Sequence, residues 1–333
     1  MVETQAKYHH LVPQTYMSAW AYGNGTLNVE FISNPGKVIP RNKEKIAGIT
    51  DFHSIKAGMP ICTKADADTI FALLTSYIIE YDGKIICDTL EMNKFYYDFD
   101  NWKITRSDGT IVSKKSLKRD IEKIKIKDIE SNWSLKYENK WGEVVSRIEH
   151  EVLETKNDNI KSFEREFITM FYTALDWRGF NSNQQFEELY NSLAKGVQMD
   201  KIDIPEKERI LPSLKTALDE MRHYLLLKYY REYLNDTGVI YQNAMAHLKH
   251  TSFHFLISDG PTKFLTSDTP VFIHYRPDGK IAGILPITPK ILMMQGRCTD
   301  EDDCYYVSHI TDEVVTHYNQ VIRNNADEFI IIP

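Results

Sequence analysis

Apolar residues change their spacing twice along this 333-residue chain, and that change constrains the fold more than any single motif. Near the start, short apolar runs such as LNVEFI alternate with turn-forming stretches such as SNPGKVIPRN, a pattern typical of short strands. In the middle, apolar residues recur every three or four positions, which predicts amphipathic helices. After residue 251, short β-prone runs such as SFHFLIS and CYYVSHI return. We therefore expect an α+β fold with a helical middle region.

Neither β-rich end has many strands of its own, so we expect the N- and C-terminal segments to build one mostly antiparallel sheet. The chain is predicted to be a single domain over residues 1–333. Its parts are a β-rich segment 1–62, a mainly helical insertion 63–250 and a β-rich segment 251–333.

Several elements follow from the same reasoning. QTYMSAWA is predicted to start a helix because Pro13 is tolerated in a first helical turn, and SDG at 107–109 indicates a hairpin turn. Helical spacing with start and stop signals predicts further helices. They cover 65–81 (with Thr63 or Asp66 as a cap), 141–177 with a break near 157, 208–234, 241–249 and 312–326, and a closing strand is expected in EFIIIP.

Composition limits the function classes. A net charge of -7 makes no whole-molecule case for nucleic-acid binding, although a local basic face can coexist with it. The start lacks the regions of a signal peptide and no window has eighteen uninterrupted apolar residues, so we expect a cytoplasmic protein without membrane contact. No CxxC pair occurs, so the cysteines are interpreted as packing thiols. They are Cys62, Cys87, Cys298 and Cys304.

The opening stretch KYHHLVPQTYMSAW carries adjacent histidines, His9 and His10. Neighbouring residues of an extended strand point to opposite faces, so only one of the two should line a pocket, and the sequence does not say which. One interpretation is a neutral imidazole that acts as a metal ligand or general base. The alternative is a buried histidine whose hydrogen bonds tie the N-terminal segment to the sheet.

Five short motifs occur in an order that resembles a known family. They are HHLVPQTYMSAWA, DFHSI at 51–55, KFLTSDTPV at 263–271, ILPITPKILMM at 284–294 and YNQVIRNNADEFI at 318–330. Together they resemble the DUF4238 proteins, a bacterial family of unknown function, over nearly the whole chain. The helical middle departs most from the family pattern. It reads DWRGF at 176–180, where the family pattern has an arginine followed by Thr-Pro.

The resemblance implies a site where polar residues from both ends of the chain converge. We expect His9, His10 and Asp268 to be catalytic, with His9 and Asp268 as possible ligands of a divalent Mg, Mn or Zn ion. Gln14, Ser267, Asn319 and Arg178 are the expected substrate-binding residues. For LTSDTP the alternative is a plain turn at a strand end, in which Ser267 or Asp268 bonds its own backbone.

Other chemical motifs are weak or missing. HHLVP is similar to the first strand of HNH endonucleases, but His53 follows too far on for that compact unit. Walker, GxGxxG and GxSxG patterns are absent. The basic segment KKSLKRDIEKIKIK, with Trp102 and Trp133 nearby, offers phosphate contacts in one interpretation. Its Asp120 and Glu122 favour the other, a solvated helix face with internal ion pairs.

Two functions remain as hypotheses. The first is a hydrolase, a metal-dependent or acid/base nuclease with nucleic acid as its partner, acting as a bacterial toxin or phage-defence effector. The defence role is an expectation from the style of such bacterial proteins. The alternative is a non-catalytic protein that senses a ligand or binds a partner through the same cluster. The oligomeric state does not follow from the sequence.

Overall fold

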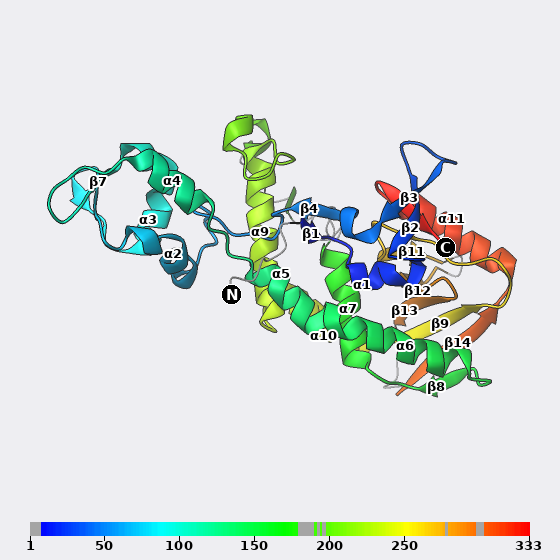
Figure 1. Cartoon of the computed structure of the whole chain (residues 1–333). Coiled ribbons are helices and arrows are strands. Elements are labelled where there is room, and N and C mark those ends of the chain that lie inside the picture. The colour runs from blue at the N-terminus through cyan, green and yellow to red at the C-terminus, as the bar shows by residue number, and fades with distance from the viewer. Residues whose placement is uncertain (1–7, 179–189, 192–193, 195–197, 277–278, 298–302) are drawn as a thin grey trace. The chain divides into compact units, whose positions relative to one another are not determined.

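The computed structural model describes residues 8–178, 190–191, 194, 198–276, 279–297 and 303–333 (Figure 1). The described chain divides into two compact units. The first contains residues 51–132 and 198–231, and the second contains the rest. The expected α+β class is confirmed, because helices fill much of the middle and all but one of the described strand pairings are antiparallel. Of the four cysteines, Cys298 lies outside the described residues.

The first unit combines short helices with a three-stranded sheet in the order β6-β5-β7. Its second segment adds most of the long helix α9, Ala217–Leu234, and the unit boundaries fall inside α5 and α9. The other elements are α2 Lys64–Ile70, β5 Ile78–Tyr81, β6 Lys84–Ile85, α3 Thr89–Phe95, β7 Lys103–Thr105, α4 Lys114–Glu122 and α5 Asp128–Trp133, with 3-10 turns at Ala72–Leu74, Tyr96–Asn101, Met199–Lys201 and Glu206–Glu208.

The helix expected over 65–81 was wrong in its second half. It ends at Ile70, and the last four residues of the expected range form strand β5. The reason is the Asp82–Gly83 turn, in which both residues have positive φ (49° and 72°). Two consecutive positive φ values suit a tight hairpin, and the β-branched Ile78 and Ile79 favour a strand before it. The expected Thr63 cap is confirmed as a capping box with Asp66.

The helix expected from residue 208 begins nine residues later, at Ala217. Pro212 disfavours helix just before it, and the helix starts where Thr216 and Asp219 cap one another. The Asp219 amide donates to Thr216 Oγ1 at 3.2 Å, and the Thr216 amide donates to the Asp219 carboxylate at 2.9 Å. The hairpin turn at 107–109 is confirmed, since the Gly109 amide bonds to the Arg106 carbonyl at 2.9 Å.

The second unit contains strands from both ends of the chain. The four-stranded sheet β10-β15-β2-β3 joins them, as expected, while strands after residue 251 mainly form a separate six-stranded sheet, β11-β12-β13-β9-β14-β8. A third, two-stranded sheet pairs β1 with β4. The strands are β1 Tyr8–His10, β2 Thr26–Phe31, β3 Val38–Asn42, β4 Gly48–Thr50, β8 Asn159–Lys161, β9 Thr251–Ser258, β10 Thr266–Ser267, β11 Phe272–Tyr275, β12 Ile281–Thr288, β13 Ile291–Arg297, β14 Cys304–Ile310 and β15 Phe329–Ile332.

Helices cover both faces of the six-stranded sheet. Helix α11 covers one face (Figure 1), and its Val315 and Ile322 share a buried core with Ile284 and Met294 of the sheet. On the other, Tyr172 of α7 lies so close to Gly283 that a Cβ there would be 2.0 Å from its hydroxyl. The helices of this unit are α1 Gln14–Met17, α6 Asn139–Leu153, α7 Arg165–Arg178, α10 Gly238–His250 and α11 Asp312–Asn325, with 3-10 turns at Ser18–Trp20 and Lys43–Lys45 and a π-helical turn at Ser134–Glu138.

Candidate functional site

The DFHSI segment of the first unit forms a tight turn that fixes the direction of His53. Asp51 has a φ of 59°, in the left-handed region, and its carbonyl accepts a hydrogen bond from the Ser54 amide at 3.0 Å. Ile55 then pairs with Ile126 through two backbone hydrogen bonds of 2.9 Å. Because Ile126 lies just before α5, these bonds hold His53 beside the start of that helix.

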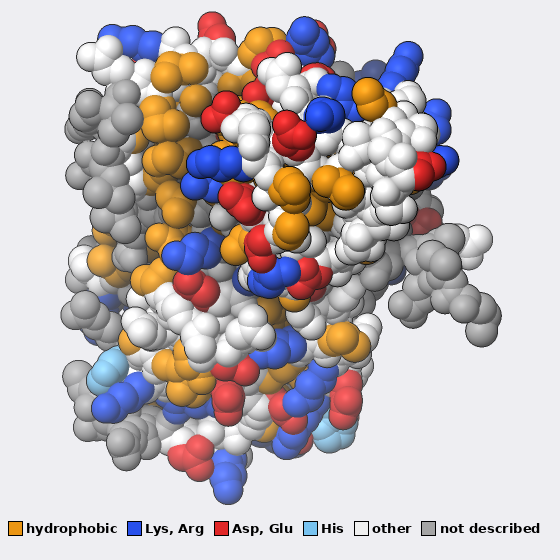
Figure 2. Space-filling view, turned by 90° about the vertical axis from the view of Figure 1, so that its left-hand side faces the viewer, with side chains coloured by type: hydrophobic (Ala, Val, Ile, Leu, Met, Phe, Trp, Pro, Cys, Tyr) orange, Lys and Arg blue, Asp and Glu red, His pale blue; other side chains and the backbone are white. Residues whose placement is uncertain are grey.

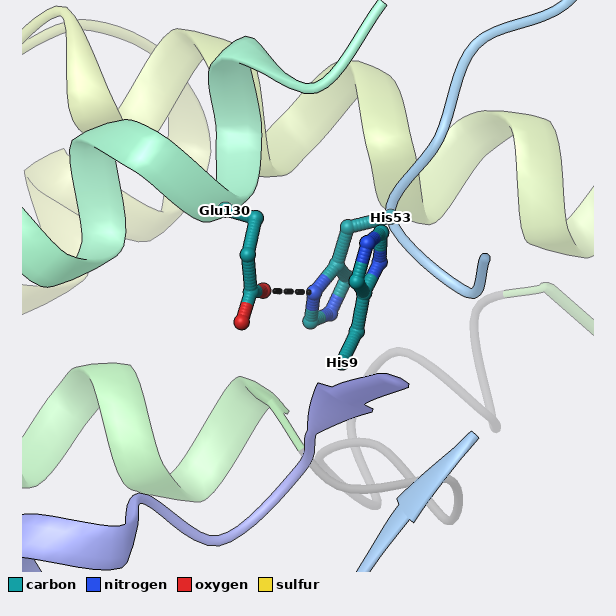
Figure 3. Close-up of side chains that lie close together, drawn as sticks. All are labelled: His9, His53 and Glu130. Atoms are coloured by element: carbon teal, nitrogen blue, oxygen red, sulfur yellow. Dashed lines mark hydrogen bonds and ion pairs between the residues drawn. The ribbon is translucent and has the colours of Figure 1, made fainter. Parts of the chain in front are cut away.

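His53 and Glu130 of α5 form a buried imidazole–carboxylate pair. Nδ1 of His53 lies 2.8 Å from Oε2 of Glu130, and the two side chains are 0% and 15% exposed. Figure 3 shows the carboxylate pointing at the imidazole edge; His9, also drawn there, belongs to the second unit and is described with it. A carboxylate accepts hydrogen bonds, so Nδ1 carries the hydrogen. The neutral ring then keeps its lone pair on Nε2, the nitrogen that takes up a proton in general-base chemistry.

Aromatic rings surround the pair. The ring of Phe52 lies 5.1 Å from that of His53, and the ring of Tyr230 lies 5.7 Å from it on the α9 side. Phe52 also packs edge-on against His223 at 4.8 Å. All of these rings are buried. An interior of this kind has a low dielectric constant, which strengthens the interaction between the imidazole and the carboxylate.

A second imidazole, His223 of α9, is held neutral in this interior. Burial lowers its pKa to about 3, and electrostatic interactions with His53 and Lys56 act in the same direction, while a hydrogen bond with the Phe52 backbone opposes them. Burial, followed by repulsion from Lys125, also lowers the pKa of Lys56. Lys125 itself forms an ion pair with Asp51. The first unit thus places buried and half-buried titratable groups of both signs around the DFHSI turn.

Arg231 anchors the first turn of α5, two residues before Glu130. Its guanidinium donates two hydrogen bonds to Asp66 of α2, at 2.6 and 2.9 Å, and two to Asp128, at 2.8 and 3.0 Å. Burial raises the pKa of Asp66, but the hydrogen bonds from Arg231 and the Thr63 amide outweigh it and hold that pKa below its usual value. The network ties α2, α5 and α9 together next to the candidate site.

The predicted histidines of the opening motif lie in the second unit, on β1. His9 and His10 pair with Ile49 and Gly48 of β4, and both imidazoles are buried (0% and 8% exposed). Nδ1 of His10 is 3.4 Å from the side-chain amide of Gln14, which stands at the start of α1. A Cβ at Gly48 would lie 2.6 Å from the His9 carbonyl oxygen, so the close pairing of β1 and β4 depends on that glycine.

Ser267 and Asp268 make hydrogen bonds to backbone groups. Ser267 Oγ donates to the Thr269 carbonyl at 3.0 Å and accepts from the Thr269 amide at 3.2 Å. The Asp268 carboxylate accepts from the amides of Asp327 and Glu328, at 3.1 and 2.7 Å. Burial raises the Asp268 pKa to about 6, although the Glu328 and Asp327 amides oppose the change. These bonds are those of a turn fastened to the start of β15.

Asn319 and Arg178 are also engaged in structural contacts. The Asn319 side chain of α11 accepts from the Leu265 amide at 2.9 Å and donates to the Lys263 carbonyl at 2.8 Å. Arg178, at the end of α7, is 2% exposed and forms an ion pair with Glu138 of the π-helical turn. Its guanidinium lies 5.3 Å from the Trp133 ring centroid. These contacts fasten α11 and α7 to their neighbours.

Within the second unit, the opening motif and the TSDTP segment meet through Tyr16 and Trp20. The Tyr16 hydroxyl donates to the Pro286 carbonyl at 2.7 Å and lies 2.7 Å from Thr266 Oγ1. The Trp20 indole donates to the Phe264 carbonyl at 2.9 Å. These contacts bring the two ends of the chain together next to Ser267. Catalysis by His9, His10 and Asp268, and metal binding by His9 and Asp268, stay predictions.

Glu130 and His223 were not predicted as site residues from the sequence. His53 was considered only as a distant partner for an HNH motif. His53 had a signal, because it lies in DFHSI, one of the five motifs on which the sequence resemblance to a family rests. Glu130 had none, since it stands in a charged helical stretch 77 residues away from His53. His223 sits within the apolar spacing of α9, where a core position is the simplest interpretation.

The family model described as "Protein of unknown function (DUF4238)" matches residues 8–332, which include both His53 and Glu130. The chain belongs to the DUF4238 family. No curated protein and no solved structure matches this DUF4238 chain. In the described part of this DUF4238 protein, none of the helices has the length and apolar content that a membrane span requires.

Proposed function

We propose that this DUF4238 protein is a cytoplasmic hydrolase that cleaves nucleic acid and acts as a bacterial toxin or phage-defence effector. The observation that carries the proposal is the buried His53–Glu130 pair, with 2.8 Å between Nδ1 and Oε2. A histidine oriented by a carboxylate is the arrangement that general-base catalysis uses. The turn at Asp51 and the Ile55–Ile126 pairing supply the rigid support that such a base needs.

In the proposed reaction, Nε2 of His53 takes a proton from water as the water oxygen attacks phosphorus. The P–O bond to the leaving sugar oxygen breaks, that oxygen takes a proton from solvent, and the imidazolium afterwards releases its proton to solvent. Glu130 keeps the proton on Nδ1 and stabilises the imidazolium that forms. Because the His53 side chain is fully buried, the reaction requires a local opening that admits substrate, as lids do in many enzymes.

Positive charge in the first unit supports a phosphate-containing substrate. Residues 103–127 hold nine Lys and Arg against three Asp and Glu, and Arg106 and Lys115 are exposed. Part of this charge is neutralised locally, since Asp120 pairs with Lys123 at 2.8 Å. Figure 2 shows Lys and Arg side chains alternating with Asp and Glu on one face. Trp102 and Trp133 are each 1% exposed, so they are unavailable for base stacking.

The test is hydrolysis of labelled DNA and RNA by the purified protein, with and without Mg²⁺ or Mn²⁺. We expect His53→Ala to lower the rate at least about 100-fold and Glu130→Gln at least about tenfold, because each removes part of the base. His309→Ala is the matched control, since His309 pairs with Asp259 at 2.6 Å on the surface. Equal rates for wild type and His53→Ala would exclude His53 as the base.

A second candidate function is non-catalytic binding of a ligand or partner. It is favoured by Ser267, Asp268 and Asn319, whose side chains bond to backbone groups as structural residues do. If no nucleic acid is cleaved while Asp268→Ala lowers only the melting temperature, this second function is preferred.

A further inference from the structure

We infer that His53 and Glu130 are two ligands of a divalent transition-metal site, with Zn²⁺ and Mn²⁺ as the ions that fit. The inference concerns the same pair as the proposed hydrolase but does not depend on hydrolysis, because metal binding and general-base action are alternative states of the His53–Glu130 pair. Imidazole nitrogen and carboxylate oxygen together suit these ions, whereas Mg²⁺ prefers oxygen ligands. The ligand atoms of His53 and Glu130 lie within 4.8 Å of one another.

The distance between Nδ1 of His53 and Oε2 of Glu130 is close to the distance between two ligand atoms of one metal ion. Ligand atoms each about 2.1 Å from a tetrahedral ion are about 3.4 Å apart. Nδ1 and Oε2 are 2.8 Å apart, so metal binding requires them to separate by roughly half an ångström. The metal takes the place of the hydrogen on Nδ1, which moves to Nε2, so the ligand is a neutral imidazole and Nε2 no longer has a free lone pair.

The backbone around the two ligands is already fixed. The Asp51 turn and the Ile55–Ile126 hydrogen bonds hold His53, and Arg231 holds α5 through Asp128. A preformed site avoids the entropy cost of ordering its ligands when the ion binds. The buried rings of Phe52 and Tyr230 add an apolar shell, which strengthens the attraction between ligand and ion.

The other histidine–carboxylate pairs found among the described residues lack these features. His309 and Asp259 are 49% and 57% exposed, and His150 and Glu154 are 67% and 72% exposed with 3.6 Å between them. Solvent competes for ions at such surface pairs, and their side chains lose more freedom on binding. They therefore serve as internal controls for the His53–Glu130 pair.

The experiment is a titration of EDTA-treated protein with Zn²⁺ and with Mn²⁺ against a chromogenic chelator, with melting temperature as a second readout. We expect one ion per chain, a higher melting temperature, and at least tenfold weaker binding in both His53→Ala and Glu130→Gln. His309→Ala should bind as wild type does. Glu130→Gln keeps the shape of the side chain, and circular dichroism confirms that each variant is folded.

Two results would overturn the inference: no ion bound to the wild-type protein at millimolar concentration, or unchanged affinity in both folded variants. Binding without hydrolysis would support the metal site and reject the proposed function. Hydrolysis by metal-free protein together with no binding would reject the metal site alone. The same titration of His223→Ala tests as a further ligand the other buried histidine of the first unit's described residues.

Discussion

His53, His223 and Asp268 are titratable side chains whose surroundings give them different chemistry. His53 shares a hydrogen with a carboxylate, whereas His223 packs against an aromatic ring and stays neutral. Asp268 was the acid that the sequence favoured, yet its carboxylate accepts two backbone amides at the start of β15. Residue type alone therefore does not separate a reactive group from a structural one; the partner of each oxygen and nitrogen does.

His223 should make the protein sensitive to acid. Its native pKa of about 3 lies below the unfolded value near 6.5, so the unfolded chain binds a proton first as the pH falls. The contribution of neutral His223 to the free energy of unfolding is fully present above pH 6.5 and is lost progressively as the pH falls toward 3. When the pH is lowered from 7.5 to 5.0, the free energy of unfolding of the wild type should fall by about 2 kcal/mol more than that of His223→Gln, whose side chain cannot ionise. Urea denaturation at each pH measures the difference.

An equal loss in both proteins would show that His223 is accessible to protons in the native state. The comparison is made between the two proteins at each pH because other acidic and basic groups titrate in the same range and contribute equally to both.

Local sequence signals predicted most helices and strands, and failed where two signals competed. Helical spacing continued past Ile70, but the Asp82–Gly83 turn and two β-branched residues made β5 instead. The closing helix was predicted at 312–326 and is found at Asp312–Asn325, where the apolar spacing places Val315 and Ile322 in the core. The candidate site had no comparable signal. Glu130 reaches His53 only because Ile55 pairs with Ile126, a contact between distant segments.

The Arg231 network should be a major source of stability for the helices it joins. Arg231→Met leaves Asp66 and Asp128 without their cation, and Asp66 is only 9% exposed. We expect the free energy of unfolding to fall by about 3 kcal/mol, the scale of breaking a buried ion pair. Lys123→Met is the control, because its pair with Asp120 is solvent-exposed and should contribute no more than about 0.5 kcal/mol.

Chemical denaturation at pH 7 measures both changes. Equal effects of Arg231→Met and Lys123→Met would mean that the network contributes no more than a surface pair. Restored stability in a triple variant that also carries Asp66→Asn and Asp128→Asn would confirm that unpaired carboxylates cause the loss.

At the scale of the whole molecule, the chain passes from one unit to the other several times, so neither unit is one continuous segment. Strands from both ends share a sheet in the second unit, as the sequence predicted, while the DFHSI turn and α5 build the candidate site in the first. Division into two units did not follow from the sequence, because each unit combines segments whose association depends on distant contacts. Net charge, by contrast, is a property of the whole chain that composition gives directly.

Binding of nucleic acid should depend on salt through the local basic segment, against a total charge of -7. The Debye length is about 10 Å at 0.1 M salt, so distant acidic groups are screened while direct phosphate contacts persist. The slope of log affinity against log salt concentration should be negative, and each contact with a duplex phosphate should add about 0.9 to its magnitude. Fluorescence anisotropy on a short duplex, with Arg106→Gln and Lys115→Gln combined, should give a slope shallower by about 2. Lys207→Gln, 84% exposed and outside the segment, should leave the slope unchanged, and an identical slope in the double variant would place the phosphate contacts elsewhere.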